Sequence, residues 1–389
     1  SASGAAGSSN AVAGTVNVLV SNSQSLASVG DYAKITAQDD VMITAESNSK
    51  LVTVMAGVAL ATSGAAAGAT INVNVLNRLT EAKIGQGAVI ISKGGSVVIQ
   101  TLSKDWALII TAAGGVSTSS TAVSGNIQTT VAQNKTTALV GDNTKITAYD
   151  SVGIVADHTS NVYLVSPTVS ISGATGVGAT AVTAVLRNEV SAGAGNNTKI
   201  TAYAMKNSET AGILTSNRNQ RRKGIVISAL GSEQILMLGI GASGTSSTAV
   251  SGVIDTLVIM NKVNAHVGNN ARMKSGASKS DDTDGDGEAD EESSSGDIDV
   301  EAEDNSVIYN FGGAVAASGS TGVGATIVTL VLDKEVKASI GAGSTTEATG
   351  NINVNAKADD NVFLVAVSFA ASGSTSVGLG GSVLIFQNE

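Results

Sequence analysis

The stretch Ser318-Gly-Ser-Thr-Gly-Val-Gly-Ala-Thr326, followed by Ile327-Val-Thr-Leu-Val-Leu332, decides the fold because versions of it recur along the chain. The other copies of its small-residue turn are Ser63–Thr70, Ser119–Asn126, Ser172–Thr180, Ser247–Val253 and Ser372–Gly380. Each unit continues into an alternating run and closes on a glycine that has an alanine three residues before it. The closing glycines are Gly30, Gly85, Gly141, Gly195, Gly268 and Gly341, at spacings of 55, 56, 54, 73 and 73 residues. This period indicates a repeat protein.

The runs between the turns predict β-strands. Ile71, Val73 and Val75 alternate with Asn72 and Asn74, and a period of two is typical of a half-buried strand. The alanine content favours helix on propensity alone, but the alternation and the regularly placed glycines outweigh it. We therefore predict an all-β, elongated parallel β-solenoid built from units of about 55 residues, with right-handed crossovers. Residues 1–389 should form a single solenoid segment of a longer chain.

The alternation also predicts which side chains face inward. We expect the three apolar residues of this run inside and the two asparagines outside. The core should be thin, because aromatic residues are only 3% of the chain and glycines number 45.

Polar residues recur at two further places in each unit. One group, which includes Asp157–Ser160 and Glu303–Asn305, predicts a solvated corner between two strands. A second polar position lies seven residues before each closing glycine and predicts a ladder on the outside. Its members are Ser23, Arg78, Asn134, Asn188, Asn261 and Lys334. A unit could form one wide turn of the solenoid or two narrower ones, and the size of ordinary β-helix rungs favours two.

Two units carry insertions at the same place, after the closing glycine. The insert at 205–223 is basic, with Arg218, Arg221, Arg222 and Lys223, and the insert at 275–295 is acidic. Residues 279–292 hold eight acids and one lysine, so the net charge of −10 becomes −3 without them. The remaining scaffold has no cluster of basic residues of the kind that binds nucleic acid. We expect both inserts to project from one face. The basic insert is either a plain soluble loop or a contact for an anionic glycan, a lipid or the acidic insert.

The acidic insert contains the strongest local motif, a candidate calcium site. Carboxylates at alternate positions and a glycine at position six can wrap a chain around Ca²⁺. The proposed ligands are Asp282, Asp284, Asp286, Glu288 and Asp290. Over nine residues the motif resembles the calcium loops of EF-hand, dockerin and thrombospondin type 3 modules. It departs from them at position twelve, where Ser293 stands in place of a bidentate acid. The alternative is a solvated acidic loop.

Other kinds of site find little support. The chain has no cysteine, which excludes disulfides, thiolate zinc sites and cysteine nucleophiles. No apolar run is long enough for a spanning helix. We interpret His158 and His266 as surface rung positions, and the acidic pairs Asp39-Asp40 and Asp359-Asp360 as turns. We therefore expect no enzyme and no catalytic residues.

The repeat units also resemble a known class of proteins. Units of the form Ser-Gly-x-x-Gly-Val-Gly-Ala-Thr, with Ala-x-Ile-Gly and Ile-Thr-Ala, are similar to repeats of large bacterial surface proteins: filamentous adhesins, leukotoxins and autotransporter passengers. The resemblance implies a secreted or cell-surface filament or stalk that attaches to a host-cell or bacterial ligand, such as a glycan, and can self-associate. The alternatives are a carbohydrate-active β-helix enzyme, or the repeat region of a secreted toxin.

Overall fold

A computed structural model describes residues 1–207, 211–214, 221–283, 288 and 292–388. These residues form three parallel β-sheets and contain no helix, so the all-β prediction is confirmed. Sheet A contains β1 (Ala2–Gly7), β4 (Val41–Ala61), β7 (Val97–Ser117), β10 (Val152–Ser172), β13 (Gly224–Thr245), β16 (Asp297–Ser318) and β19 (Ile352–Ser372). Sheet B contains β2 (Ala11–Val29), β5 (Ala66–Ile84), β8 (Thr121–Val140), β11 (Thr175–Ala194), β14 (Thr248–Val267), β17 (Thr321–Ile340) and β20 (Thr375–Asn388). Sheet C contains β3 (Lys34–Ala37), β6 (Val89–Ser92), β9 (Lys145–Ala148), β12 (Lys199–Ala202), β15 (Arg272–Ser275) and β18 (Thr345–Ala348).

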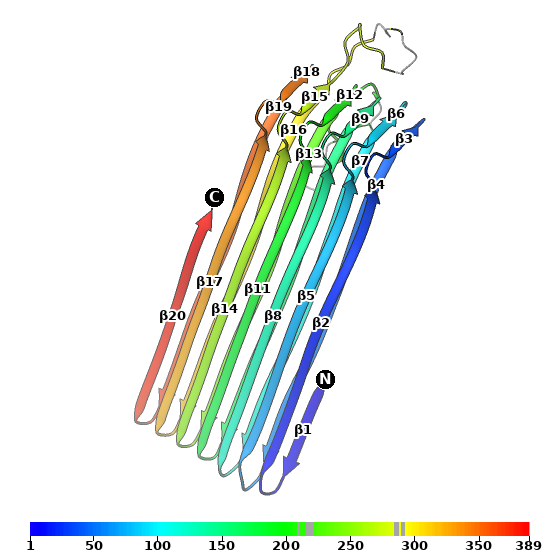
Figure 1. The fold of residues 1–389 in the computed structure, drawn as a ribbon. Coiled ribbons are helices and arrows are strands. Elements are labelled where there is room, and N and C mark those ends of the chain that lie inside the picture. Colours follow the sequence, from blue (N-terminus) through cyan, green and yellow to red (C-terminus); the bar gives the residue numbers. More distant parts are fainter. Residues whose placement is uncertain (208–210, 215–220, 284–287, 289–291, 389) are drawn as a thin grey trace.

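Each repeat unit forms one wide turn of a parallel solenoid. The chain runs along a strand of sheet A, returns along sheet B and passes through sheet C to the next turn (Figure 1). Equivalent residues of successive units pair in register, as Ala82 does with Ala138 and Ala138 with Ala192. The prediction that a unit forms two narrower turns was wrong. Two strands of about 20 residues and one of 4 residues account for nearly the whole unit, so it forms a single turn.

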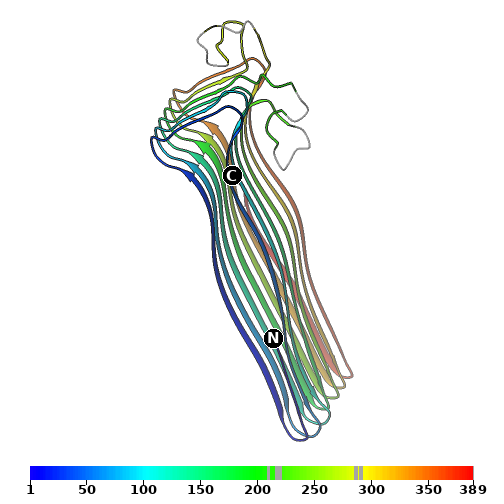
Figure 2. The same cartoon turned by 90° about the vertical axis from the view of Figure 1, so that its right-hand side faces the viewer.

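The two long sheets form a flattened body, here called the blade (Figure 2). Its proximal end carries sheet C, and its distal end consists of the turns from sheet A to sheet B. The inserts leave the blade at the proximal end, one between β12 and β13 and the other between β15 and β16.

The turn after each closing glycine explains why that glycine recurs. A Cβ added to Gly141 would lie 2.6 Å from the amide nitrogen of Gln86 in the neighbouring coil, so stacking leaves no room for a side chain. Two residues later the backbone takes a left-handed conformation, with φ between 55° and 71°, where glycine and asparagine are favoured. The residues at this position are Tyr32, Gly87, Asn143, Asn197, Asn270 and Gly343.

The interior of the blade changes character from the proximal to the distal end. Near sheet C it is an apolar core that includes Ile84, Ile90 and Ile99. A row of buried polar and charged residues follows, and then a second apolar layer that includes Leu186, Ile235 and Leu257. The distal interior is made of small residues, hydroxyls and amides, as in the 3.0 Å hydrogen bond from Thr111 to Gln128.

The distal half reverses the prediction about which face is inside. Asn72 and Asn74 are fully buried, whereas Ile71 is 38% exposed. The side chain of Asn17 donates to Oδ1 of Asn72 at 2.8 Å. Amide groups of adjacent coils therefore bond to each other inside the blade, although Nδ2 of Asn72 and Oδ1 of Asn74 have no hydrogen-bond partner among the described residues.

The close approach of the two sheets causes this reversal. A Cβ added to Gly115 of sheet A would lie 2.6 Å from the carbonyl oxygen of Val123 in sheet B, and one added to Gly324 would lie 2.9 Å from that of Phe369. The distal interior has no room for large side chains at these positions. Small residues therefore face inward, and valine and isoleucine face outward.

Two other sequence interpretations were wrong for a related reason. The polar segments expected at solvated corners, such as Asp157–Ser160, lie in the middle of long strands, and Asp157, His158 and Ser160 are buried. The ladder expected on the outside lies inside the blade: Arg78, Asn134, Asn188, Asn261 and Lys334 are at most 8% exposed. Only Ser23 at the first coil is exposed. Polar partners inside the blade make this burial tolerable.

The outer side of sheet A carries aromatic residues beyond its midpoint. Tyr309 stacks on Phe363 with ring centroids 5.1 Å apart, and Lys50 lies 5.1 Å from the ring centroid of Trp106. Within the described part of the chain, no helix is long and apolar enough to cross a membrane.

Candidate functional site

The candidate calcium loop lies mostly outside the described residues. Asp284, Asp286 and Asp290 are not described; Asp282 is half-buried and Glu288 is exposed. The described residues contain no cluster of three or more histidine, cysteine or acidic side chains that could hold a metal ion. The site therefore stays a prediction.

The beginning of the acidic insert packs against cations of its own chain. Asp281 forms an ion pair with Lys274 and accepts a 2.7 Å hydrogen bond from the backbone amide of Ser278. These partners lower the pKa of Asp281, although its partial burial acts in the opposite direction. Asp282 and Thr283 border a cavity of about 280 Å³ on the outer side of sheet C, which is also lined by Lys93, Lys145 and Lys199. A bound Ca²⁺ near Asp282 would therefore lie close to several lysines, which weakens its binding.

Calorimetry tests the calcium prediction directly. We expect wild type to bind Ca²⁺ with modest affinity, in the micromolar-to-millimolar range of weaker calcium loops. Asp284→Ala/Asp286→Ala should abolish the heat of binding, because it removes two hard oxygen ligands. Equal heats from both proteins, or none from either, would show that the insert is a solvated loop.

The described part of the basic insert covers the outer side of sheet A. Ile213 packs against Val155 and Val226, and Gly153 leaves room for it. Arg222 forms ion pairs of 2.9 Å with both Asp299 and Glu301 of β16. Burial raises the pKa of Glu301 above its ordinary value, while Arg222 opposes the shift. Arg222 therefore anchors the insert to the blade.

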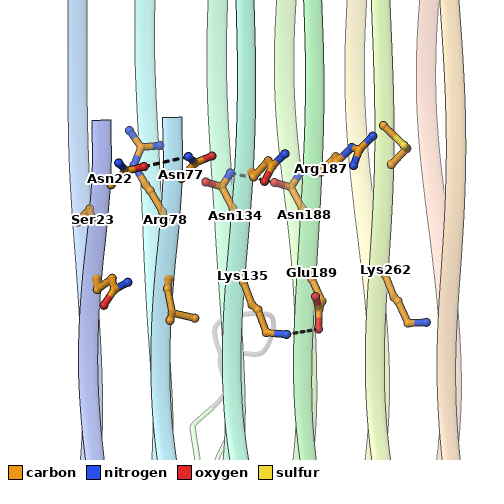
Figure 3. Close-up of a pocket in the computed structure, with 14 residues that line it drawn as sticks. Asn22, Ser23, Asn77, Arg78, Asn134, Lys135, Arg187, Asn188, Glu189 and Lys262 are labelled. Atoms are coloured by element: carbon orange, nitrogen blue, oxygen red, sulfur yellow. Dashed lines mark hydrogen bonds and ion pairs between the residues drawn. The ribbon is translucent and has the colours of Figure 1, made fainter. Parts of the chain in front are cut away.

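A groove across sheet B is the best candidate for a binding site. It has a volume of about 620 Å³ and crosses β2, β5, β8, β11 and β14 at the middle of the blade (Figure 3). One wall is a row of outward side chains from successive coils: Asn22, Asn77, Gln133, Arg187 and Met260. The other wall is Gln24, Leu79, Lys135, Glu189 and Lys262.

Hydrogen bonds and ion pairs connect neighbouring coils along the groove. The amide of Asn77 donates to Oδ1 of Asn22 at 2.9 Å, and Lys135 pairs with Glu189 at 2.8 Å (Figure 3). Lys262 pairs at 2.8 Å with Glu335, whose pKa is lowered by Lys262 and by Lys337. Arg187 is exposed and has no ion-pair partner among the residues that the structure describes. The groove thus offers amide groups, a free guanidinium and two cations in weak surface pairs.

The inward-facing ladder lies directly behind the groove and forms a buried polar belt with sheet A. Arg78 pairs with Asp105 at 2.9 Å and donates to Ser49 at 2.6 Å. Farther along, Asn134 donates to Asn188 at 2.9 Å, and Asn188 donates to Asn261 at 3.1 Å. The belt therefore continues across coils as a hydrogen-bonded ladder and gives the groove a rigid floor.

The C-terminal part of the belt contains the buried charges. Lys334 lies 2.8 Å from Asp304 and 2.5 Å from Asp360. Burial lowers the pKa of Lys334, but the attraction of Asp304 outweighs it, so the pKa lies above its ordinary value. Burial raises the pKa of Glu233 well above its usual range, and Asp304 raises it further. Lys334 is therefore charged, while Glu233 keeps its proton at pH values where an exposed glutamate has lost it.

The structure also corrects the interpretation of two expected surface residues. His158 is buried in the belt, 3.5 Å from Asn134, and burial lowers its pKa although Asp105 opposes the shift. Asp360 lies within β19 and contacts Lys334, so the pair Asp359-Asp360 is not a turn. Asp39-Asp40 does lie in a turn, between β3 and β4.

Sequence reasoning identified the ladder but missed the groove in front of it. Comparison with protein-family models, curated proteins and solved structures finds no match to this chain. The site therefore has to be interpreted from its own chemistry. One signal could have located the ladder. Arg78 and Lys334 lie four residues before the closing alanines Ala82 and Ala338, so within a strand they face the same side of the sheet as these alanines. The row of closing alanines is buried in the central coils.

Proposed function

We propose that this chain is a structural and adhesive segment of a bacterial cell-surface or secreted protein, and that its groove attaches to an extended acidic polysaccharide. The observation that carries the proposal is the groove itself. It runs along the stacking direction, and each coil adds one outward side chain to each wall. Most of these side chains are polar or charged. A linear polymer lying across the strands would meet equivalent positions about every 4.8 Å.

The charges of the groove favour an anionic ligand. Its walls carry Arg187, Lys135 and Lys262 against a single acid, Glu189. Surface ion pairs of this kind contribute only about 0–1 kcal/mol each, so a carboxylate of the ligand can replace one at little cost. The amide side chains of Asn22, Asn77 and Gln133 both donate and accept, which suits sugar hydroxyls.

We expect Arg187→Ala to weaken binding of polygalacturonate by about ten-fold or more, because hydrogen bonds to charged groups contribute about 1.5–3 kcal/mol. Affinity electrophoresis or calorimetry measures the change. Lys104→Ala is the matched control, because Lys104 is also exposed and lies on the outer side of sheet A. It should bind as wild type does.

An uncharged dextran should bind at least several-fold more weakly than the acidic polymer. If Arg187→Ala and Lys104→Ala weaken binding equally, the attraction is general and the groove is not the site.

Incubation of the protein with the acidic polysaccharide also distinguishes attachment from catalysis. New reducing or unsaturated ends in the polysaccharide would show a carbohydrate-active enzyme instead.

A further inference from the structure

Among the residues that the structure describes, the distal half of the blade carries no charged side chain on its surface. This half comprises the parts of sheets A and B beyond the polar belt. Five of its segments contain no charged residue, and a sixth contains only Asp255, which is fully buried. The five are 51–77, 106–133, 162–186, 307–332 and 361–388, and the sixth is 234–261. A large apolar surface without charged side chains is unusual for a monomeric protein in water.

The outer side of sheet B in this half has a regular relief. A row of small residues forms the floor of a shallow groove of about 440 Å³, and it includes Gly125, Ala179, Gly252 and Ala325. One adjacent row stands higher on the side of the polar belt and includes Ile127, Ile254 and Ile327, which are 49–53% exposed; the smaller Ala181 lies between the first two. The row on the distal side includes Val123, Val177, Val250 and Val323. The surface is therefore two apolar ridges with a groove between them, running along the stack.

The size of this face fits a protein interface. Nine residues of each strand, from Val12 to Val20 in β2, extend about 30 Å, and seven strands extend about 34 Å across. The face therefore measures about 1,000 Å², compared with about 800 Å² per partner in a standard stable interface. Isolated monomers rarely leave apolar patches larger than about 300–600 Å² exposed.

We propose that two copies of this chain pack face to face through the distal half of sheet B. Two flat sheets pack about 10 Å apart with interdigitated side chains, and a ridge of one copy fits the small-residue groove of the other. A two-fold axis then places one ridge of each copy in the groove of the other. Lipid tails would cover the same apolar area, but they require neither ridges nor a groove at a fixed spacing.

Sheet A is the less suitable face. Its outer side in the same half carries Trp106, Tyr163, Pro167, Tyr309 and Phe363, which differ from coil to coil. The resulting surface has no continuous groove of small residues that matches a ridge. The pairing does not depend on the proposed polysaccharide groove, which lies nearer the proximal end.

Sedimentation equilibrium tests the pairing. We expect wild type to dimerise, and Ile127→Lys/Ile254→Lys to weaken the dimer by about a hundred-fold or more, because a charge would be buried without a partner. The matched control is Ile171→Lys/Val315→Lys on the outer side of sheet A, where the residues are 51% and 42% exposed. It should leave the dimer intact. Circular dichroism should show that all three proteins are folded.

A label experiment avoids any dependence on charged variants. Because the chain has no cysteine, Ala181→Cys places a single nitroxide within the row of Ile127 and Ile254 on sheet B, and Ala242→Cys places one on the outer side of sheet A. Spin–spin broadening between copies should appear only for Ala181→Cys. A monomeric wild type, a dimer unaffected by Ile127→Lys/Ile254→Lys, or a monomer that binds phosphatidylcholine vesicles through this face would each overturn the proposal.

Discussion

Replacing Lys334 by methionine is expected to lower the free energy of unfolding by about 3–5 kcal/mol. The side chain of Lys334 is fully buried between Asp304 and Asp360, which are 0% and 9% exposed. Methionine fills a similar volume but leaves two carboxylates inside the blade without a cation. Breaking a buried ion pair costs far more than the pair contributes, because the remaining charge stays desolvated.

Two further variants distinguish this effect from a simple loss of packing. Lys334→Met/Asp304→Asn/Asp360→Asn removes all three charges and should recover most of the lost stability. Lys262→Met removes a cation of the surface pair with Glu335 and should cost only about 0–1 kcal/mol.

Hydrogen exchange measured by mass spectrometry locates the change. Because each coil contacts mainly its neighbours, exchange should accelerate in β16, β17 and β19 and stay unchanged in β2 and β5. A single Lys334→Met variant as stable as wild type, with unchanged exchange in β17, would refute the idea that the belt depends on its charges.

The period of the fold could be predicted from the sequence because it reflects contacts between neighbouring coils. The closing glycines from Gly85 onward lie against the backbone of the preceding coil and leave no room for a Cβ, so each of these units needs glycine at that position. The aligned residues of the repeats are the residues that pair in the sheets. Spacing alone therefore gave both the repeat and its register.

The choice of the inner face could not be predicted in the same way. Alternation divides Ile71–Val75 into two faces, but it does not indicate which one is buried. That choice depends on how closely sheets A and B approach, which is set in part by residues far along the chain, such as Gly114, whose carbonyl oxygen lies where a Cβ of Gly68 would be. Hydrophobicity suggested the opposite answer, because large apolar residues do not fit between the two sheets here.

The polar belt was hidden for a second reason. Polar segments such as Asp157–Ser160 are typical of turns, and nothing local shows that they lie in the middle of a strand of 21 residues. Their partners come from the other sheet: Asp105 meets Arg78, and Asp304 meets Lys334. Such pairs become visible only once the strands are placed opposite each other.

Asp255 should make the stability of the blade depend on pH. It is fully buried in the distal half, and the backbone amide of Gly239 donates to its Oδ2 at 3.1 Å. Val182 and Val328 occupy the paired positions on both neighbouring strands. Burial raises the pKa of Asp255 from 3.8 to about 7, although the hydrogen bond from Gly239 opposes the shift. No other charged residue occurs in the described distal segments.

The direction of the effect follows from proton binding. Well below pH 3.8 the carboxyl group is protonated in both the folded and the unfolded chain, so it does not reduce stability. As the pH rises towards 7, the unfolded chain loses the proton while the folded chain keeps it, and stability falls. A shift of about three pKa units corresponds to about 4 kcal/mol above pH 7.

We therefore expect Asp255→Asn to be about as stable as wild type at pH 4 and more stable by up to about 4 kcal/mol at pH 8. Thermal unfolding of both proteins at pH 4, 6 and 8 measures the difference. Glu189→Gln is the control, because it also removes a carboxylate but at a partly exposed site, and its difference from wild type should stay within about 1 kcal/mol. A difference between Asp255→Asn and wild type that is constant with pH would show that Asp255 is charged in the folded blade, and that the distal interior holds enough polarity to stabilise it.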